Sequence, residues 1–296
     1  MRIFNVAVLV AAVAIFGSSG VASAAPKDYC ADLKGGNTGR TCEIQLADAG
    51  YNVNISIPLD YPDQKSVADY IAQTRDGFLN VAKSSAPRDT PYELNITPTE
   101  YNSAVPPRGT QAVVFKVYQN VGGAHPQTMF KAFNWDQSYR KAIIYTAAPD
   151  DKLNTPLWRV DDPLKTVGPI VQAELQKQMA PPAPIAPPAT TTPTTPSPTN
   201  APTTPPTSTT PTPPPLAIAP TALYNPNFYQ NFAVVNDGVI FFFDQGTLLP
   251  EAAGATQVLV PRSAIDPMIA QVSTFGEGSR VRPDAAVRCW SCAGIC

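Results

Sequence analysis

The stretch FAVVNDGVIFFFDQGTLLPEAAGATQVLVP, residues 232–261, decides how the rest of the chain has to fold. It reads as two very apolar strands joined at Asn236-Asp237-Gly238, followed by a connection and a third strand from Thr256 to Val260. Asp-Gly between apolar runs is a strong hairpin signal, because a type I′ turn needs positive φ at both of its central residues. We therefore expect a hairpin with a type I′ turn and a third strand after it.

The strand that follows this turn is apolar on both of its faces. Side chains alternate along a strand, so Val239, Phe241 and Phe243 point to one side of the sheet. Ile240 and Phe242 point to the other side. Both faces need to be covered, and the hairpin therefore needs partners from elsewhere in the chain.

Residues 1–24 have the layout of a cleaved secretory signal. Arg2 precedes an apolar run from Val6 to Phe16, and Ala22-Ser23-Ala24 provides the small residues of a cleavage site. The apolar run is shorter than the roughly 20 residues that a membrane-spanning helix needs. We expect the mature protein to be secreted and extracellular, with no transmembrane segment after signal cleavage.

The overall charge speaks against binding to nucleic acid. The formal net charge is −2 at pH 7 and the isoelectric point lies near 5.4. Nucleic-acid binders generally carry a basic stripe that displaces counterions from phosphates. No such stripe is found in the sequence, so no nucleic-acid partner is expected.

Two of the five cysteines fall near the start of the expected mature chain. Cys30 and Cys42 flank a loop that contains glycine and threonine, in a chain expected to be exported, where disulfides persist. We predict that these two pair. The other three lie in the ending CWSCAGIC. A zinc site needs four clustered ligands, whereas this ending offers three thiols and the histidine is distant in sequence. We expect residues 271–296 to be a disordered tail.

Strands and helices alternate up to residue 179. Period-two and period-3.6 patterns predict strands at 51–57, 92–97, 111–121, 127–135 and 142–145, and helices at 63–83 and 169–179. Pro98 either stops the second of these strands or places it at a sheet edge. Gly168-Pro169 interrupts the last helical pattern, so we expect a short turn first and a helix only from about Pro169.

The composition changes abruptly between Ala180 and Pro220. This Pro/Thr tract has no charged residue and cannot bury enough apolar surface to offset the entropy of ordering it. Residues 221–270 alone would form an incomplete, marginal sheet. We therefore expect one α+β domain built from residues 25–179 and 221–270, with the tract as a disordered insertion. Loop-closure entropy grows only logarithmically with length, so such an insertion is tolerated.

One residue could act in catalysis, and it is the single histidine, His125, in the connection Gly122-Gly123-Ala124-His125-Pro126. A hydrolase would use such a histidine as the general base for a serine nucleophile. The mature chain has no G-x-S-x-G motif, however. A loop histidine held by glycine backbone geometry is the simpler interpretation. We expect no catalytic, cofactor-binding or metal site, and keep His125 as the alternative.

Nine segments together form a recognisable pattern: APKDYC, YPDQKS, YIAQTRD, PYELNIT, PPRGTQAVVFKVYQN, GGAHP, KAFNWDQSYRK, NFAVVNDGVIFFF and LLPEAAGATQVLVPRSAID. With them the chain closely resembles the secreted immunogenic antigen family of mycobacteria, over nearly all of residues 1–180 and 221–270. More distantly, GGAHP with the FFF hairpin is similar to the extracellular domain of RsiV-type anti-sigma factors. It is also similar to a domain that accompanies some peptidoglycan deacetylases.

The resemblance implies a secreted α+β protein with a mixed, β-grasp-like sheet that host immunity recognises. It also suggests partner binding, since lysozyme is the ligand of the RsiV-type domain, while an esterase activity is ascribed to one relative. We expect a monomeric, non-enzymatic antigen or effector that binds a host or cell-envelope protein. The alternative is a weak secreted carboxylesterase that uses His125.

Overall fold

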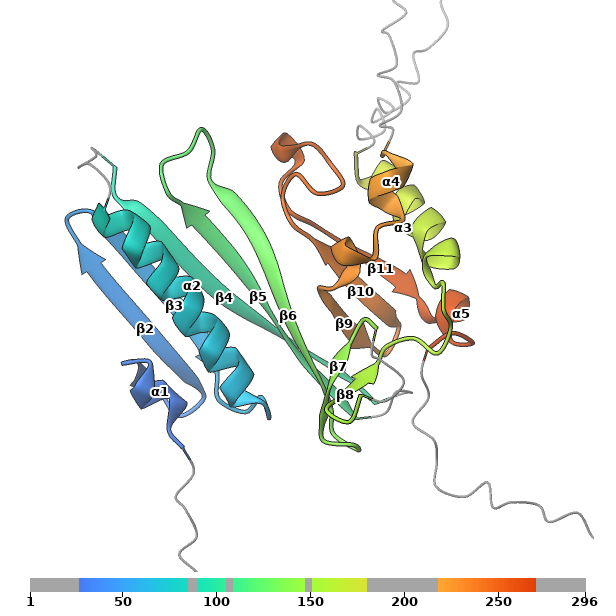
Figure 1. The fold of residues 1–296 in the computed structure, drawn as a ribbon, viewed down its shortest axis with the longest axis horizontal. Helices are drawn as coiled ribbons and strands as arrows, with labels where there is room; N and C mark the ends of the chain where they lie inside the picture. Colours follow the sequence, from blue (N-terminus) through green and yellow to red (C-terminus); the bar gives the residue numbers. More distant parts are fainter. Residues whose placement is uncertain (1–26, 85–89, 105–108, 147–150, 180–217, 270–296) are drawn as a thin grey trace, which may run out of the picture.

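Two β-sheets pack face to face in the computed structural model, with one long helix on the outer face of each (Figure 1). The structure describes residues 27–84, 90–104, 109–146, 151–179 and 218–269. The larger sheet contains β1 (Gly36–Asn37), β2 (Thr41–Asp48), β3 (Tyr51–Pro58), β4 (Tyr92–Ser103), β5 (Thr110–Asn120), β6 (Gln127–Asp136), β7 (Lys141–Ile144) and β8 (Asn154–Pro156). The smaller sheet contains β9 (Phe232–Val235), β10 (Gly238–Phe243) and β11 (Thr256–Pro261). The helical segments are α1 (Tyr29–Asp32), α2 (Gln64–Ser84), α3 (Leu164–Met179), α4 (Pro220–Leu223), η1 (Pro226–Tyr229), η2 (Glu251–Ala253) and α5 (Arg262–Ile265).

The larger sheet is mixed and its strands follow one another in chain order. Its neighbours are antiparallel except for the pairs β3–β4 and β7–β8. Parallel neighbours need a crossover connection, and α2 supplies it between β3 and β4. The smaller sheet is antiparallel, in the order β11-β10-β9. The expected α+β fold with a mixed sheet is thus confirmed.

Helix α2 covers the outer face of the larger sheet. Val67, Ile71 and Phe78 are buried against side chains of β3, β4 and β5, as the helical spacing predicts. Val81, which the same spacing placed inward, is instead 41% exposed. Ala82 is buried in its place. The apolar face of the last turn is therefore rotated by one residue from the expected one.

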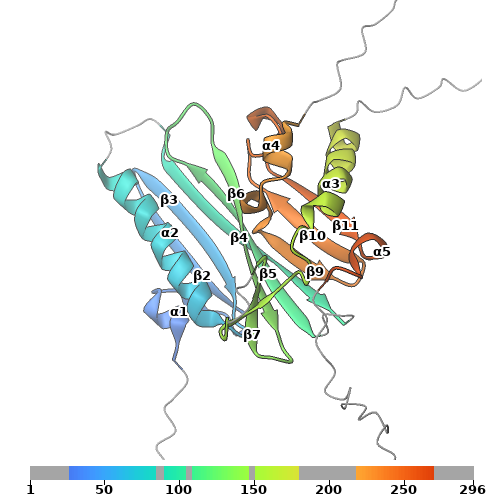
Figure 2. The same ribbon diagram turned by 45° about the vertical axis from the view of Figure 1, so that its right-hand side comes forward.

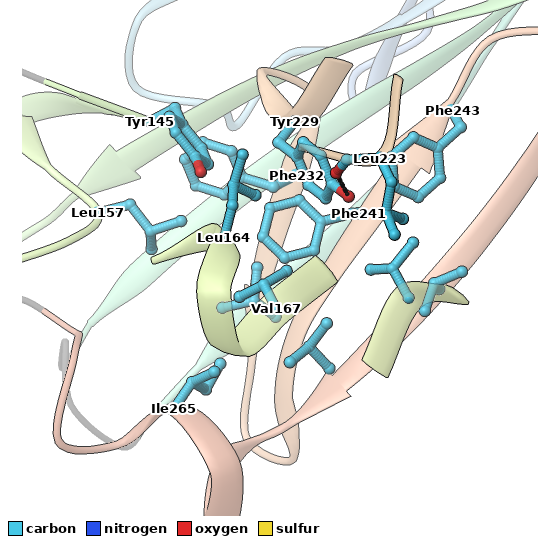
Figure 3. Packing of buried hydrophobic residues seen from close by; sticks show 14 of the residues in the cluster. Tyr145, Leu157, Leu164, Val167, Leu223, Tyr229, Phe232, Phe241, Phe243 and Ile265 are labelled. Atoms are coloured by element: carbon cyan, nitrogen blue, oxygen red, sulfur yellow. Dashed lines mark hydrogen bonds between the residues drawn. The ribbon is translucent and has the colours of Figure 1, made fainter. Parts of the chain in front are cut away.

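Both faces of β10 are covered, as its sequence requires. Val239, Phe241 and Phe243 are fully buried in a cluster that includes residues of α3 and the ring of Tyr229 (Figure 3). Phe242 on the opposite face packs with residues of β4, β5 and β6. The smaller sheet therefore lies between α3 and the larger sheet.

The turn between β9 and β10 differs from the expected type I′ geometry. Neither Asn236 nor Asp237 is among the non-glycine residues with positive φ. Gly238 follows the turn and lies against β11, where a Cβ would come within 2.0 Å of the carbonyl oxygen of Val260. The glycine is thus needed for the close approach of two strands.

Helix α3 passes through Gly168-Pro169, where the sequence predicted that a helix would only begin. Val171 and Leu175 are fully buried against the smaller sheet, and this packing outweighs the one hydrogen bond that Pro169 cannot donate. Gly168 lets the helix approach Tyr224, because a Cβ would lie 2.8 Å from Cε1 of that ring. Tertiary contacts therefore override the local signal.

The amino-terminal end of the described chain is tied to the sheet by the predicted disulfide. Cys30 in α1 is bonded to Cys42 in β2, and both side chains are buried. Strand β2 itself was missed by the sequence reading, although Cys42 and Ile44 alternate with Glu43 and Gln45 as a half-buried strand requires. The disulfide joins α1 to the outer part of the larger sheet.

Several predictions fall on residues outside the described ranges, namely the signal at 1–24, most of the Pro/Thr tract and the tail at 271–296. Ile218 is described and buried, and α4 begins at Pro220, so the folded part resumes before residue 221. Within the described residues, no helix is both long enough and apolar enough to cross a bilayer.

Candidate binding cleft between the two sheets

Side chains that flank strands β9 and β10 of the smaller sheet bind the edge of β6. Strand β7 pairs only with Trp135 and Asp136 at the end of β6, so the earlier N–H groups on that edge have no strand partner. Three of them donate to side chains, which we call the β6 clasp: Thr128 N to Gln245 Oε1 at 3.0 Å, Phe130 N to Asp244 Oδ1 at 2.7 Å, and Ala132 N to Asn231 Oδ1 at 3.1 Å. The clasp fixes the smaller sheet on the larger one.

Asp244 is the ionisable member of the clasp. Burial raises the pKa of its carboxyl group, and the N–H of Phe130 that it accepts opposes the rise. Its charged form is therefore penalised by desolvation and stabilised by one hydrogen bond. We therefore expect the attachment of the two sheets to depend on pH.

Figure 2 shows the smaller sheet beside β4, β5 and β6 of the larger one. A cleft of about 580 Å³ lies between the two sheets. Thr97, Thr99 and Tyr101 of β4 share the face that lines it, because alternate side chains of a strand point the same way. Lys116 of β5 lies opposite both Thr97 and Phe130 in the strand ladder. The lining is completed by Val114, Gln178, Phe242, Ala255, Thr256 and Gln257.

Packed rings form the floor of the cleft. The ring centroid of Phe242 lies 5.8 Å from that of Tyr101 and 5.2 Å from that of Phe130. Burial raises the pKa of Tyr101, so its hydroxyl stays neutral near pH 7 and can donate or accept. The cleft thus combines an apolar floor with polar walls.

The walls of the cleft offer hydrogen bonds and one positive charge. Their polar groups are threonine hydroxyls, two glutamine amides and the ammonium group of Lys116. Gln178 Nε2 donates to the carbonyl oxygen of Gln257 at 3.0 Å and so joins α3 to β11 at the rim. The lining, as far as the chain is described, contains no carboxylate, imidazole or thiol. Its chemistry suits binding rather than activation of a nucleophile.

His125 lies in the loop between β5 and β6, at an exposed position outside the lining of the cleft. Among the described residues, no hydrogen bond or ion pair joins it to a serine or a carboxylate. No group of His, Cys, Asp and Glu in the same part of the chain is placed to hold a metal ion. Within the described residues, the structure therefore does not bring His125 together with a serine and a carboxylate that could complete a catalytic site.

Comparison with known proteins places the chain among mycobacterial relatives. The immunogenic proteins MPT64 of Mycobacterium tuberculosis and MPB64 of Mycobacterium bovis are each 55% identical over 271 residues, which cover 91% of this chain and 100% of the relative. Esterase Rv3036c of Mycobacterium tuberculosis is 38% identical over 263 residues, covering 88% of this chain and 96% of that protein.

A family model described as a protein of unknown function (DUF3298) matches residues 156–263. A solved DUF3298 family protein from Pseudomonas aeruginosa PAO1 is 11% identical, with a TM-score of 0.44, and covers 78% of this chain and 92% of that one. That structural likeness is too low to carry an argument, whereas the identity to MPT64 and MPB64 extends over nearly the whole chain. The chain therefore belongs to the family of the mycobacterial immunogenic proteins MPT64 and MPB64.

Proposed function

We propose that the protein is an exported, single-domain antigen or effector that binds a host or cell-envelope protein in the cleft between its two sheets. The observation that carries this proposal is the lining of the cleft, with exposed hydroxyl, amide and ammonium groups above a floor of packed rings. An apolar surface with a few directed polar groups is typical of binding sites.

Two further observations support an exported antigen. The relatives that are 55% identical carry the name immunogenic protein. The buried disulfide between Cys30 and Cys42 suits an oxidising compartment such as the extracellular space. Together with the signal pattern of residues 1–24, they favour a secreted antigen that acts by binding a partner.

Equilibrium binding of the purified mature chain to lysozyme and to solubilised cell-envelope protein tests the proposal. Thr99→Trp fills the cleft, and Lys116→Glu reverses its charge; both positions are exposed, so the fold should persist. Lys152→Glu, outside the cleft, makes the same charge change as a control. We expect both cleft variants to lose affinity by on the order of tenfold, about 1.4 kcal/mol, and the control to bind normally.

Two outcomes would count against this function. If the cleft variants bind as tightly as the wild type, the partner sits on another surface. If the wild type binds neither lysozyme nor envelope protein, the binding function itself loses its support.

A second candidate function is ester hydrolysis, because the relative that is 38% identical is named an esterase. In this case His125 would act as general base, and His125→Ala would lower the turnover of a short-chain p-nitrophenyl ester by about a hundredfold or more. Lys152→Glu again serves as the control. Turnover that His125→Ala leaves unchanged would remove His125 from any catalytic role.

A further inference from the structure

A second pocket lies beside α3, on the face of the smaller sheet opposite the cleft. Its volume is about 400 Å³. Its polar and aromatic lining residues are Tyr145, Thr146, Trp158, Arg159, Asp161, Asp162 and Tyr224. None of these residues lines the cleft between the sheets. We call this separate site the α3 pocket.

Two buried polar atoms of the α3 pocket have no hydrogen-bond partner in the protein. The side chains of Tyr145 and Trp158 are only 3% and 6% exposed, and neither Tyr145 Oη nor Trp158 Nε1 forms a hydrogen bond. Tyr229 in the same aromatic cluster, by contrast, donates its hydroxyl to the carbonyl oxygen of Leu223 at 2.6 Å (Figure 3). Buried polar groups are nearly always paired, so the two exceptions indicate a partner from outside the chain.

The hydroxyl group of Tyr145 is held in its neutral form. Burial raises its pKa, the carboxylate of Asp162 raises it further, and the indole N–H of Trp158 opposes the rise without reaching hydrogen-bond geometry. Figure 3 shows the oxygen of Tyr145 on the side of Leu164, where α3 begins. A neutral hydroxyl at this place can both donate and accept a hydrogen bond.

Carboxylates and an exposed ring surround these two atoms. Asp161 has no ion-pair partner among the described residues, whereas Asp162 lies 3.2 Å from the ammonium nitrogen of Lys165. The Nε of Arg159 donates to the carbonyl oxygen of Pro267 at 2.6 Å, and the guanidinium keeps its positive charge at the pocket. Tyr224 is 45% exposed and offers an apolar ring surface at the mouth.

We propose that the α3 pocket binds a saccharide through neighbouring hydroxyl groups. Trp158 Nε1 needs an acceptor, Tyr145 Oη can donate or accept, and the exposed carboxylate of Asp161 can accept from a ligand. A sugar hydroxyl is both donor and acceptor and so suits all three groups. The apolar face of a pyranose ring fits against the ring of Tyr224.

Other ligand classes satisfy only part of the pocket. An anion would accept from Trp158 and be attracted by Arg159, but the two carboxylates of Asp161 and Asp162 outnumber this one positive charge and repel it. A cationic amine would pair with the two carboxylates and leave the indole N–H of Trp158 unsatisfied. The donor and acceptor inventory therefore favours a neutral, polyhydroxylated ligand.

Entry of a sugar requires part of the wall to move, because Tyr145 Oη and Trp158 Nε1 are sealed from solvent. Tyr224 has by far the most exposed of the three lining rings. Its exposed ring is therefore the surface that a sugar meets first.

Ligand-observed NMR on the full mature chain tests this site, with methyl α-mannoside, N-acetylglucosamine and arabinose as sugar probes. We expect at least one sugar to bind, and Tyr145→Phe and Asp161→Asn each to weaken it by about tenfold, the value of one hydrogen bond. Asp161 is exposed, so its variant keeps the test valid if Tyr145→Phe destabilises the core. Tyr139→Phe removes a hydroxyl outside the pocket and should bind normally.

Choline and inorganic phosphate serve as the cationic and anionic probes. Binding of either one in place of a sugar would overturn the proposal, and so would sugar binding that neither pocket variant changes. Absence of any sugar binding would overturn it as well. Buried water would then be the partner of Tyr145 Oη and Trp158 Nε1. The variants do not touch the cleft between the sheets, so these outcomes are independent of the binding function proposed above.

Discussion

At the scale of single residues, Asp244 shows how one half of the chain holds the other. Asp244→Ala leaves the N–H of Phe130 without its acceptor, and we expect a loss of about 1–2 kcal/mol in the free energy of unfolding. Asp244→Asn keeps an acceptor oxygen and removes a desolvated charge, so its stability at pH 7 should equal or exceed that of the wild type. Urea denaturation of the three proteins measures this. An asparagine variant as unstable as the alanine variant would contradict it.

The same carboxyl group gives a pH dependence with a definite sign. Burial raises the pKa of Asp244 in the folded protein, so the folded state binds this proton more tightly than the unfolded state does. The contribution of Asp244 to stability therefore increases as the pH falls through the raised pKa and is lost as the pH rises above it. We expect the unfolding free energy of the wild type, relative to that of Asp244→Asn, to increase as the pH falls. A decrease of this difference at lower pH would refute the expectation.

Gly238 is the second residue whose replacement has a clear expectation. A Cβ there would come within 2.0 Å of the carbonyl oxygen of Val260, so Gly238→Ala should cost about 1–3 kcal/mol or more, because β10 and β11 must move apart. Gly77→Ala in α2 is the matched control: it meets nothing within 4 Å and should stabilise the helix by roughly 0.5–1 kcal/mol. Thermal unfolding measures the change in stability of both variants, which should be a loss for Gly238→Ala and a gain for Gly77→Ala. Equal changes in the two variants would refute the steric argument.

At the scale of elements, the disulfide fastens α1 to β2. It joins cysteines separated by 12 residues, and the chain-entropy model gives a loop of this size about 3 kcal/mol of stabilisation. We expect reduction, or replacement of Cys30 and Cys42 by serine, to lower the unfolding free energy by about that amount. Thiol reductant should then have no further effect on the double serine variant. Sensitivity of that variant to reductant would place the stabilising bond elsewhere.

The elements also show where the sequence predicts structure and where it does not. The apolar residues of β10 on both faces predicted that this strand is sandwiched, because burial on two sides requires an unbroken apolar run. The start of α3 could not be predicted, since Gly168-Pro169 is a local signal and the packing that overrides it comes from Tyr224 and the smaller sheet. Strand β2 could have been found from its own alternation.

At the scale of the whole molecule, the apolar core beside α3 combines residues from both sides of the Pro/Thr tract, such as Val171 and Phe241. Residues 25–179 expressed alone should therefore be molten or insoluble, because α3 would lose the surface it covers. Replacing 180–215 by a short Gly-Ser linker should leave one cooperative unfolding transition. Calorimetry of both proteins checks this. A sharp two-state melt of residues 25–179 alone would show that the chain has two domains.

The candidate sites follow from this same joining of distant segments. Thr97 and Gln257 face one cleft, and Tyr145 and Tyr224 line one pocket. No spacing in the sequence relates them, because their proximity depends on how two sheets pack. What the sequence does show is His125 in a glycine loop, and the structure places it away from both sites.

The β6 clasp can form only late in the synthesis of the chain. Its three hydrogen bonds join residues 99, 114 and 117 positions apart, and a ribosome delivers the amino-terminal partner first. The edge of β6 stays open until Gln245 has been synthesised, and the smaller sheet is complete only after β11, which ends at Pro261. The clasp can therefore close only after the strands of the smaller sheet have left the ribosome, and until then the edge of β6 is open to pairing with other chains.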